Sequence, residues 1–246
     1  PRQRVAHRAD TQEESGQEPI AIIGAHAVMP GSPDLDSFWG NILAGKDLIG
    51  EIPADRWDWR TVYADAPGDP NKIKWGGFID DVDKFDAQFF SISPREAALM
   101  DPQHRLFLGA VWKTVEDAGY KASELSGSRT GVFAGVSSFD YHDICKNAKA
   151  NVDAYFTTGQ AHSLLANRIS YLLNLHGPSE PIDTACSSSL IAIHRAVNAI
   201  RHGECDLAIA GGVNLILTPT LNMSFSNAGM LCEDGRCKTF DKRANG

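Results

Sequence analysis

One cysteine lies where an expected strand gives way to an expected helix. The segment DTACSSSL, residues 183–190, follows the short apolar run at 181–182 and leads into LIAIHRAVNAI, residues 190–200. The first turn of a helix leaves backbone N–H groups without partners, and the helix dipole adds a partial positive charge there. At such a place the pKa of a cysteine thiol can fall from about 8.5 into the range of about 3.5–7.5. The pattern therefore predicts that Cys186 is an acyl-transfer nucleophile, with the same N–H groups stabilising the oxyanion formed from an attacked thioester.

The helix that follows this cysteine is predicted to span about residues 187–202 and to be buried. One apolar stripe repeats at helical spacing, and small or apolar residues fill most of the remaining surface, which is typical of a helix covered on all sides. The stripe consists of Leu190, Ile193, Val197 and Ile200. The three serines suit a crowded first turn because their hydroxyls can satisfy nearby backbone groups. Two interpretations remain open: Cys186 is a nucleophile, or it is a small apolar residue of the core.

The elements that would position this cysteine alternate between apolar strands and amphipathic helices. Such alternation predicts an α/β layered fold, in which helices cover a largely buried sheet. Residues 50–90 show no long period, and we expect an irregular region held in place by its aromatic side chains. The predicted strands cover residues 19–24, 129–136, 181–185 and 207–210, and the predicted helices cover 35–43 after an Asp34 cap, 94–119 with Gly119 as the stop, 163–174 and 187–202.

Composition excludes several classes of protein. The chain has 246 residues, a formal net charge of −8 and a pI of about 5.4, and it shows no concentration of Lys and Arg for binding nucleic acid. No segment approaches the roughly 20 continuous apolar residues that a membrane span needs. Residues 1–17 are polar and are predicted to be a linker rather than a secretory signal. Five cysteines at irregular spacing argue against a disulfide framework and favour a reduced, cytoplasmic setting.

Other chemical motifs are incomplete. Gly24 is followed by His26 and Met29 rather than by the further glycines of a dinucleotide-binding loop. Cys232 and Cys237 have no second pair of ligands, so a zinc site is not expected. The eight histidines include His194 and His202 on or beside the helix after Cys186, where a structural role is expected.

The region around Cys186 resembles the active-site segment of ketosynthases, the β-ketoacyl synthase domains of modular polyketide and fatty-acid synthases. The resemblance extends from about residue 18 to the end of the chain and follows the order of the family's motifs. These are PIAIIG at 19–24, IPADRWD at 52–58, KWGGFI at 74–79, FFSISPREA at 89–97, MDPQ at 100–103, ANRISY at 166–171, DTACSSSL at 183–190, GECDLA at 203–208, AGGVN at 210–214 and DGRCKTFD at 234–241.

This resemblance implies a thiolase-like layered fold, with helices around a mixed β-sheet, of which residues 18–246 form the N-terminal, nucleophile-bearing half. It implies that Cys186 accepts an acyl chain from the phosphopantetheine of an acyl carrier protein, with no cofactor bound directly by the chain. A malonyl unit on a second carrier protein would then lose carbon dioxide and condense with that chain. The resemblance further implies a homodimer, with the strand around residues 180–184 pairing across the two-fold axis, within a larger multidomain synthase.

The condensing histidines of ketosynthases lie in the second half of the domain, which is expected to continue beyond residue 246. None of the eight histidines of this chain matches them, so an alternative stays open: a non-elongating ketosynthase that only transfers or docks acyl chains. RWDW at 56–59, KWGGFID at 74–80 and EPIDTACSSSL at 180–190 resemble polyketide synthases served by a separate (trans) acyltransferase. His104 and Gly109 stand where the family more often has Gln and Glu.

Overall fold

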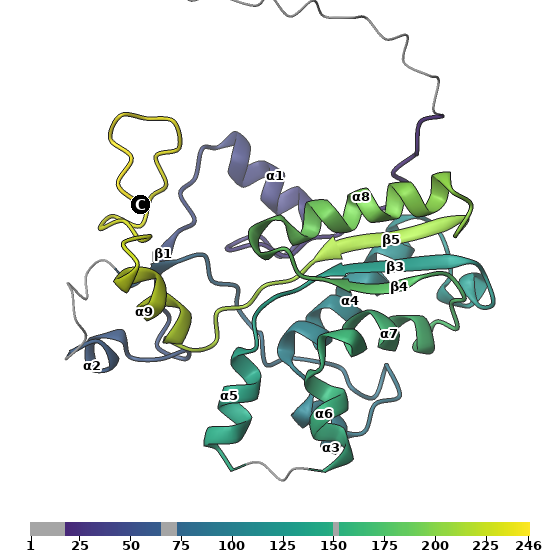
Figure 1. The fold of residues 1–246 in the computed structure, drawn as a ribbon, viewed down its shortest axis with the longest axis horizontal. Coiled ribbons are helices and arrows are strands. Elements are labelled where there is room, and N and C mark those ends of the chain that lie inside the picture. The colour runs from purple at the N-terminus through teal and green to yellow at the C-terminus, as the bar shows by residue number, and fades with distance from the viewer. Residues whose placement is uncertain (1–17, 65–72, 150–152) are drawn as a thin grey trace, which may run out of the picture.

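A parallel three-stranded sheet forms the centre of the chain. The computed structural model describes residues 18–64, 73–149 and 153–246 (Figure 1). Strands β3 (Thr130–Gly135), β4 (Ser179–Ile182) and β5 (Leu207–Gly212) lie in the order β4-β3-β5, and β3 pairs parallel with both neighbours. The predictions for β3 and β5 are confirmed. The strand predicted at 181–185 begins two residues earlier and ends at Ile182, which places the cysteine turn wholly outside the sheet.

Helices cover both faces of this sheet, as the predicted α/β layering requires (Figure 1). Helix α8 (Ser188–Arg201) packs on one face, and α4 (Pro102–Asp117) and α7 (His162–Leu172) pack on the other. Alternate residues of β3 point to opposite layers: Val132 and Ala134 join the core of α4 and α7, whereas Phe133 joins the alanines of α8. All six residues of β3 are buried, as expected for the central strand of a parallel sheet.

Local signals set several helix ends. Asp34 accepts a hydrogen bond from the Ser37 backbone N–H at 2.7 Å and begins α1 (Leu35–Leu43), as predicted. Gly119 follows the end of α4 with a φ of +79°, a conformation that suits glycine. The other helices in the part of the chain that the structure describes are α2 (Trp59–Val62), α3 (Pro94–Leu99), η2 (Ala122–Leu125), α5 (Asp140–Asn147), α6 (Ala154–Gln160), η3 (Ala185–Ser187) and α9 (Thr220–Asn227).

The single helix predicted over residues 94–119 is wrong, because the chain forms α3 and α4 with a break at Met100 and Asp101. Both residues at the break have extended ψ angles, of 132° and 130°. The ring of Pro102 disfavours helical geometry at the preceding residue, so the first helix ends there. Asp101 then accepts a hydrogen bond from the Gln103 backbone N–H and caps the second helix.

The buried strand predicted at residues 19–24 is also wrong. This segment makes no strand pairing, and Ile22 is 90% exposed. Its end contacts the C-terminal end of α4 instead of the sheet: the Ala25 N–H donates to the Asp117 carboxylate at 2.8 Å. An apolar run becomes a strand only when another strand accepts its backbone hydrogen bonds, and the sequence pattern does not show that partner.

Residues 50–90 form the irregular, aromatic region that was predicted, apart from residues 65–72, which lie outside the described residues. Strands β1 (Gly50–Glu51) and β2 (Trp75–Gly76) pair antiparallel beside a small core. That core comprises Ile52, Trp57, Trp59, Tyr63 and Ile73. The Trp75 indole N–H donates to the Glu233 carbonyl at 3.0 Å, which fastens the C-terminal segment to this region. The predicted linker at residues 1–17 likewise lies outside the described residues.

Candidate functional site

Cys186 lies in a tight turn between β4 and α8. The Asp183 carboxylate accepts a hydrogen bond from the Ala185 backbone N–H at 3.0 Å, which starts the turn as soon as the strand has ended. Ala185 has a φ of +54°, in the left-handed region that non-glycine residues seldom adopt. The 3-10 turn η3 (Ala185–Ser187) then carries the cysteine, and α8 begins at Ser188. The thiol is therefore held immediately before the first turn of a 14-residue helix.

Serine hydroxyls close this turn, as the sequence predicted. The Ser187 hydroxyl donates to the Thr184 carbonyl at 2.8 Å, and the Ser188 hydroxyl donates to the Ala185 carbonyl at 2.7 Å. Ser188 also accepts a hydrogen bond from the Thr184 N–H at 2.9 Å. These bonds satisfy backbone groups on both sides of Cys186 and offset the cost of the strained residue before it.

Two glycines let the start of α8 sit directly on the ends of the strands. A Cβ atom added to Gly135, the last residue of β3, would lie 2.9 Å from backbone atoms of Ser188 and Ser189. A Cβ added to Gly212, the last residue of β5, would lie 2.9 Å from the Ser189 Cβ. Real Cβ atoms do not approach so closely, so both positions require glycine for α8 to keep its place. The cysteine turn thus lies at the carboxyl ends of the parallel strands, where α/β folds bind ligands.

The surroundings of Cys186 differ from the predicted buried helix. Cys186 is exposed, so its interpretation as an apolar core residue is wrong for this structure. Helix α8 buries only one face, made of small residues at helical spacing: Ala192, Ala196 and Ala199. Leu190 is 70% exposed and Ile193 is 48% exposed on the other side. Small side chains let α8 approach the sheet closely, and its larger apolar side chains therefore point outward.

The other cysteines separate clearly from Cys186. Cys145 and Cys205 are buried, and burial raises the pKa of each thiol, which keeps both protonated. The buried Cys232 donates its S–H to the Arg236 carbonyl at 3.1 Å. Cys237 is exposed but belongs to no helix or strand. Among the five, Cys186 alone combines exposure with a place at the start of a helix.

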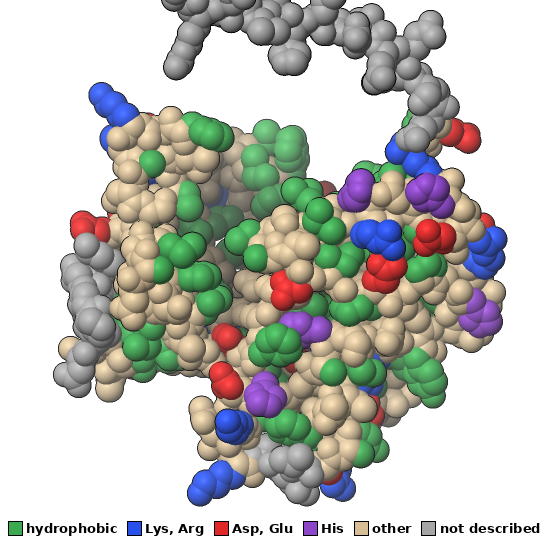
Figure 2. All heavy atoms as spheres, viewed as in Figure 1, with side chains coloured by type: hydrophobic (Ala, Val, Ile, Leu, Met, Phe, Trp, Pro, Cys, Tyr) green, Lys and Arg blue, Asp and Glu red, His purple; other side chains and the backbone are tan. Residues whose placement is uncertain are grey.

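A cleft of about 740 Å³ runs along β5, between α4 and the start of α8. Gly212 and Ser189, which contact each other, line its end near the cysteine turn, and Gly109 of α4 lines its wall. In the space-filling view, hydrophobic side chains gather on both sides of the hollow between the sheet and the C-terminal segment (Figure 2). The start of α8 is therefore reached from a largely apolar groove.

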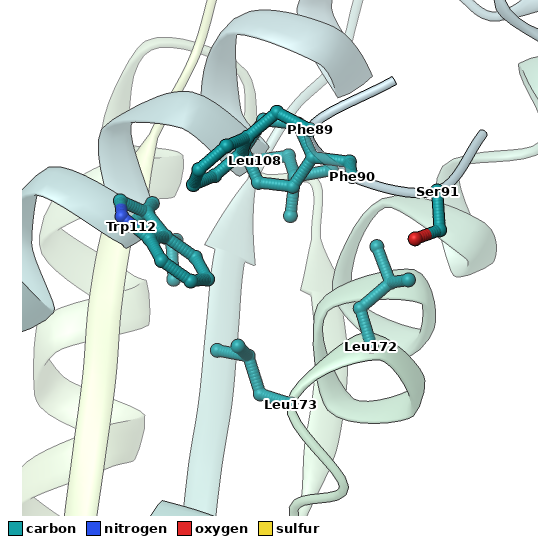
Figure 3. A pocket seen from close by; sticks show the side chains of 8 residues that line it. Phe89, Phe90, Ser91, Leu108, Trp112, Leu172 and Leu173 are labelled. Atoms are coloured by element: carbon teal, nitrogen blue, oxygen red, sulfur yellow. The ribbon is translucent and has the colours of Figure 1, made fainter. Parts of the chain in front are cut away.

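A smaller cavity of about 150 Å³ lies in the other helical layer (Figure 3). Its walls come from α4, α7 and the segment before α3, with Phe89, Trp112 and Leu172 among them. Figure 3 shows these side chains converging on an apolar space. The cavity lies on the face of the sheet away from α8, so it is separate from the cysteine turn.

The two histidines on or beside α8, for which a structural role was predicted, lie on the surface. His194 and His202 are both exposed, and His194 lies 2.9 Å from the Asn198 amide nitrogen, one helical turn away. Within residues 18–64, 73–149 and 153–246, no group of three or more His, Cys, Asp or Glu side chains is placed to hold a metal ion. None of the helices in these ranges is long and apolar enough to cross a bilayer.

Comparison with known proteins decides the family. The family model of the β-ketoacyl synthase N-terminal domain matches residues 17–246, almost the whole chain. The chain belongs to this family. The predicted thiolase-like α/β fold and the N-terminal position within it are thereby confirmed, since solved ketosynthases share the structure.

The relatives and the solved structures that this chain resembles are polyketide synthases and ketosynthase domains. Polyketide synthase PksN of Bacillus subtilis is 49% identical over 237 residues, which are 96% of this chain and 4% of that protein. Polyketide synthase PksL of the same organism is 47% identical over 92% of this chain and 5% of its own length. The ketosynthase from module 6 of the bacillaene synthase of B. subtilis superposes with a TM-score of 0.82 at 42% identity, over 92% of this chain and 37% of that one.

An oxazolomycin ketosynthase domain of Streptomyces albus gives a TM-score of 0.81 at 39% identity, over 90% of this chain and 38% of its own. The chain thus spans less than two fifths of each solved ketosynthase and a far smaller share of each synthase. It is a ketosynthase N-terminal domain of the modular polyketide synthase type.

Proposed function

We propose that this domain takes part in polyketide chain elongation, with Cys186 as the acyl-accepting nucleophile. The observation that carries the proposal is the placement of an exposed cysteine at the carboxyl edge of a parallel sheet, immediately before a long helix. Membership of the β-ketoacyl synthase family and similarity to polyketide synthases supply the reaction class.

The first chemical step is thioester exchange. The Cys186 thiolate attacks the carbonyl carbon of an acyl thioester carried on the phosphopantetheine of an acyl carrier protein. Backbone N–H groups at the start of α8 stabilise the resulting oxyanion, helped by the positive end of the helix dipole. The pantetheine sulfur then leaves and takes up a proton, so that one thioester is broken and another is formed on the cysteine.

The second step forms the carbon–carbon bond. A malonyl group on a carrier protein loses carbon dioxide, and the electron pair left on its α-carbon attacks the acyl carbon on Cys186. The cysteine sulfur leaves as a thiolate, and the product is a β-ketoacyl group on the carrier protein. This step needs the two further histidines that the resemblance to ketosynthases implies, and none of the eight histidines in this sequence matches their motifs.

The partners follow from the same chemistry. We propose that the domain works with acyl carrier proteins in a cytoplasmic multidomain synthase, binds no cofactor of its own, and forms a homodimer in which β4 pairs across the two-fold axis. β4 is an edge strand of the described sheet, which leaves one side of its backbone open to such pairing.

The RWDW, KWGGFID and EPIDTACSSSL segments support a synthase of the trans-acyltransferase type.

Intact-mass spectrometry of the intact protein after incubation with an acyl-pantetheine thioester tests the nucleophile. We expect one acyl adduct per chain in the wild type and none in Cys186→Ala. The matched control is Cys237→Ala, which removes the other exposed cysteine and should keep the adduct. An adduct that survives Cys186→Ala, or no adduct on folded wild-type protein, would reject the assignment.

Addition of malonyl carrier protein to the acylated wild type then separates elongation from mere transfer. Release of the adduct as a chain two carbons longer supports elongation. An acyl group that stays on Cys186, or that returns unchanged to a carrier protein, identifies the non-elongating alternative.

A further inference from the structure

Two loops leave the carboxyl edge of the sheet beside β4, the strand that the cysteine turn follows. The first follows β3 and the second, residues 213–219, follows β5. The Val136 N–H donates to the carbonyl of Ile182, the last residue of β4, at 3.0 Å, and the Val213 N–H donates to the Gly135 carbonyl at 3.0 Å. Both loops therefore begin within one residue of the strand ends that carry the start of α8.

A buried amide from α4 connects these two loops. Gln103 is 1% exposed and accepts two hydrogen bonds at Oε1, from the Ser138 hydroxyl at 2.9 Å and from the Leu215 backbone N–H at 3.2 Å. Its Nε2 donates to the Ser138 carbonyl at 3.1 Å and lies 3.3 Å from the Asp101 carboxylate. One side chain thus fixes the first loop through Ser138 and the second through Leu215.

The chemistry of this link requires an amide. The amide oxygen accepts hydrogen bonds from both loops, and the amide nitrogen donates a hydrogen bond to one of them. Neither a carboxylate nor a hydrocarbon side chain can make all of these hydrogen bonds. Each of these contacts lies in or at the edge of the core, where an unsatisfied polar group destabilises the fold. Burial raises the pKa of the neighbouring Asp101, so a second carboxylate at position 103 would add a further charge to a site that already disfavours one.

Further contacts fix the same loops without replacing Gln103. The Asp140 carboxylate accepts from the Leu217 and Thr218 N–H groups at 2.8 and 2.9 Å. The His162 ring lies 3.0 Å from the Ser138 carbonyl through Nε2 and stacks on Phe139 at 3.8 Å. The Asp140 contacts are partly buried, whereas the bond from Gln103 to the second loop is buried. Among the side chains in the described ranges, Gln103 is the one that hydrogen-bonds both Ser138 and Leu215, near the strand ends.

We propose that Gln103 is a positioning residue for acylation: it fixes the two loops that start beneath the first residues of α8, and these loops orient the acyl thioester for attack by Cys186. The proposal rests on the function proposed above. Within the described residues, no hydrogen bond of the Gln103 side chain reaches Cys186. Gln103 therefore acts on the orientation of the bound thioester and leaves the reactivity of the thiol unchanged. A displacement of about 1 Å in such a site can cost about a hundredfold in rate.

The test compares two reagents on the intact protein in a Cys237→Ala background. An acyl-pantetheine thioester must be oriented by the loops, whereas iodoacetamide is a small electrophile that reports only the reactivity and exposure of the thiol. For Gln103→Leu we expect kcat/KM for acylation to fall about tenfold or more, with the iodoacetamide rate unchanged. Gln103→Glu keeps an accepting oxygen but loses the donor to Ser138 and adds a carboxyl group beside Asp101, so it should also slow acylation and leave the iodoacetamide rate unchanged.

The control is Asn41→Leu, which removes a buried amide that donates to the Gly31 carbonyl and to the Ser32 hydroxyl, away from the sheet edge. It should cost stability but leave acylation unchanged. The positioning role is overturned if Gln103→Leu is acylated at the wild-type rate, or if its rates with the thioester and with iodoacetamide fall equally. It is also overturned if Asn41→Leu loses as much acylation rate as Gln103→Leu. If Gln103→Leu does not fold, Gln103→Glu decides on the same criteria, and failure of the wild type to acylate rejects the proposed function instead.

Discussion

At the scale of single residues, His104 shows how burial sets the charge state of a group. It lies on α4 and is 3% exposed, and among the described residues neither ring nitrogen has a hydrogen-bond partner. Burial, and after it the positive charge of Arg168, lower its pKa from 6.5 to about 3. The ring is therefore neutral in the folded chain at every pH at which the domain is expected to work.

This depressed pKa predicts a loss of stability in acid. Below pH 6.5 the unfolded chain binds a proton at this position and the folded chain does not, so the free energy of unfolding decreases as the pH falls from 6.5 towards 3. The contribution of this one group is at most about 1.4 kcal/mol per pH unit. His104→Gln should flatten the dependence, as measured by urea unfolding at several pH values. The exposed His194→Gln is the control, and parallel curves for wild type and His104→Gln would contradict the prediction.

At the residue level, the sequence predicted the local geometry of the cysteine turn correctly, whereas the nucleophilic role of Cys186 stays a prediction. Cys186 and the serines after it form one continuous motif, and the turn that holds them closes within six residues. Gln103 was missed as a link because its partners Ser138 and Leu215 lie 35 and 112 positions away along the chain. The only signal for it was the MDPQ motif at 100–103, which carries no indication of those partners.

At the scale of elements, caps and stops were predictable, whereas pairing was not. Asp34 and Gly119 act on neighbouring backbone, so their types reveal the helix ends. The break before Pro102 follows an equally local rule, yet the continuing apolar spacing obscured it. The strand expected at residues 19–24 depended on a partner strand, and the outward-facing Leu190 depended on which face of α8 meets the sheet. Both are properties of tertiary packing.

Two glycines test how closely elements must approach. Gly135→Ala should destabilise the fold by about 1–3 kcal/mol and slow acylation of Cys186, because its Cβ would collide with backbone at the start of α8. Gly40→Ala is the matched control, since a Cβ there meets nothing within 4 Å in the interior of α1, away from the cleft. It should stabilise the protein by about 0.5–1 kcal/mol. Thermal unfolding and acylation rates measure both, and equal effects of the two substitutions would contradict this account of the strand ends.

At the scale of the whole molecule, the sheet ends at β4, and the cysteine turn follows that strand directly. If β4 pairs with its copy across a two-fold axis, each residue at the axis meets its counterpart from the other protomer. Pro181 is exposed at the middle of this edge strand. Pro181→Lys would therefore bring two like charges together, in the manner by which lysine blocks pairing of exposed strand edges. We expect this variant to shift the intact protein from dimer to monomer in sedimentation analysis.

The matched control for this charge is Tyr171→Lys, because Tyr171 is 84% exposed on α7 and belongs to no strand. It should leave the dimer intact. Since β4 leads into the turn of Cys186, loss of pairing should also loosen that turn and slow acylation in Pro181→Lys alone. A variant that stays dimeric with unchanged acylation would place the interface elsewhere. A monomer that acylates at the wild-type rate would show that the turn is held by its own serines and by the glycine-lined strand ends, without help from the partner.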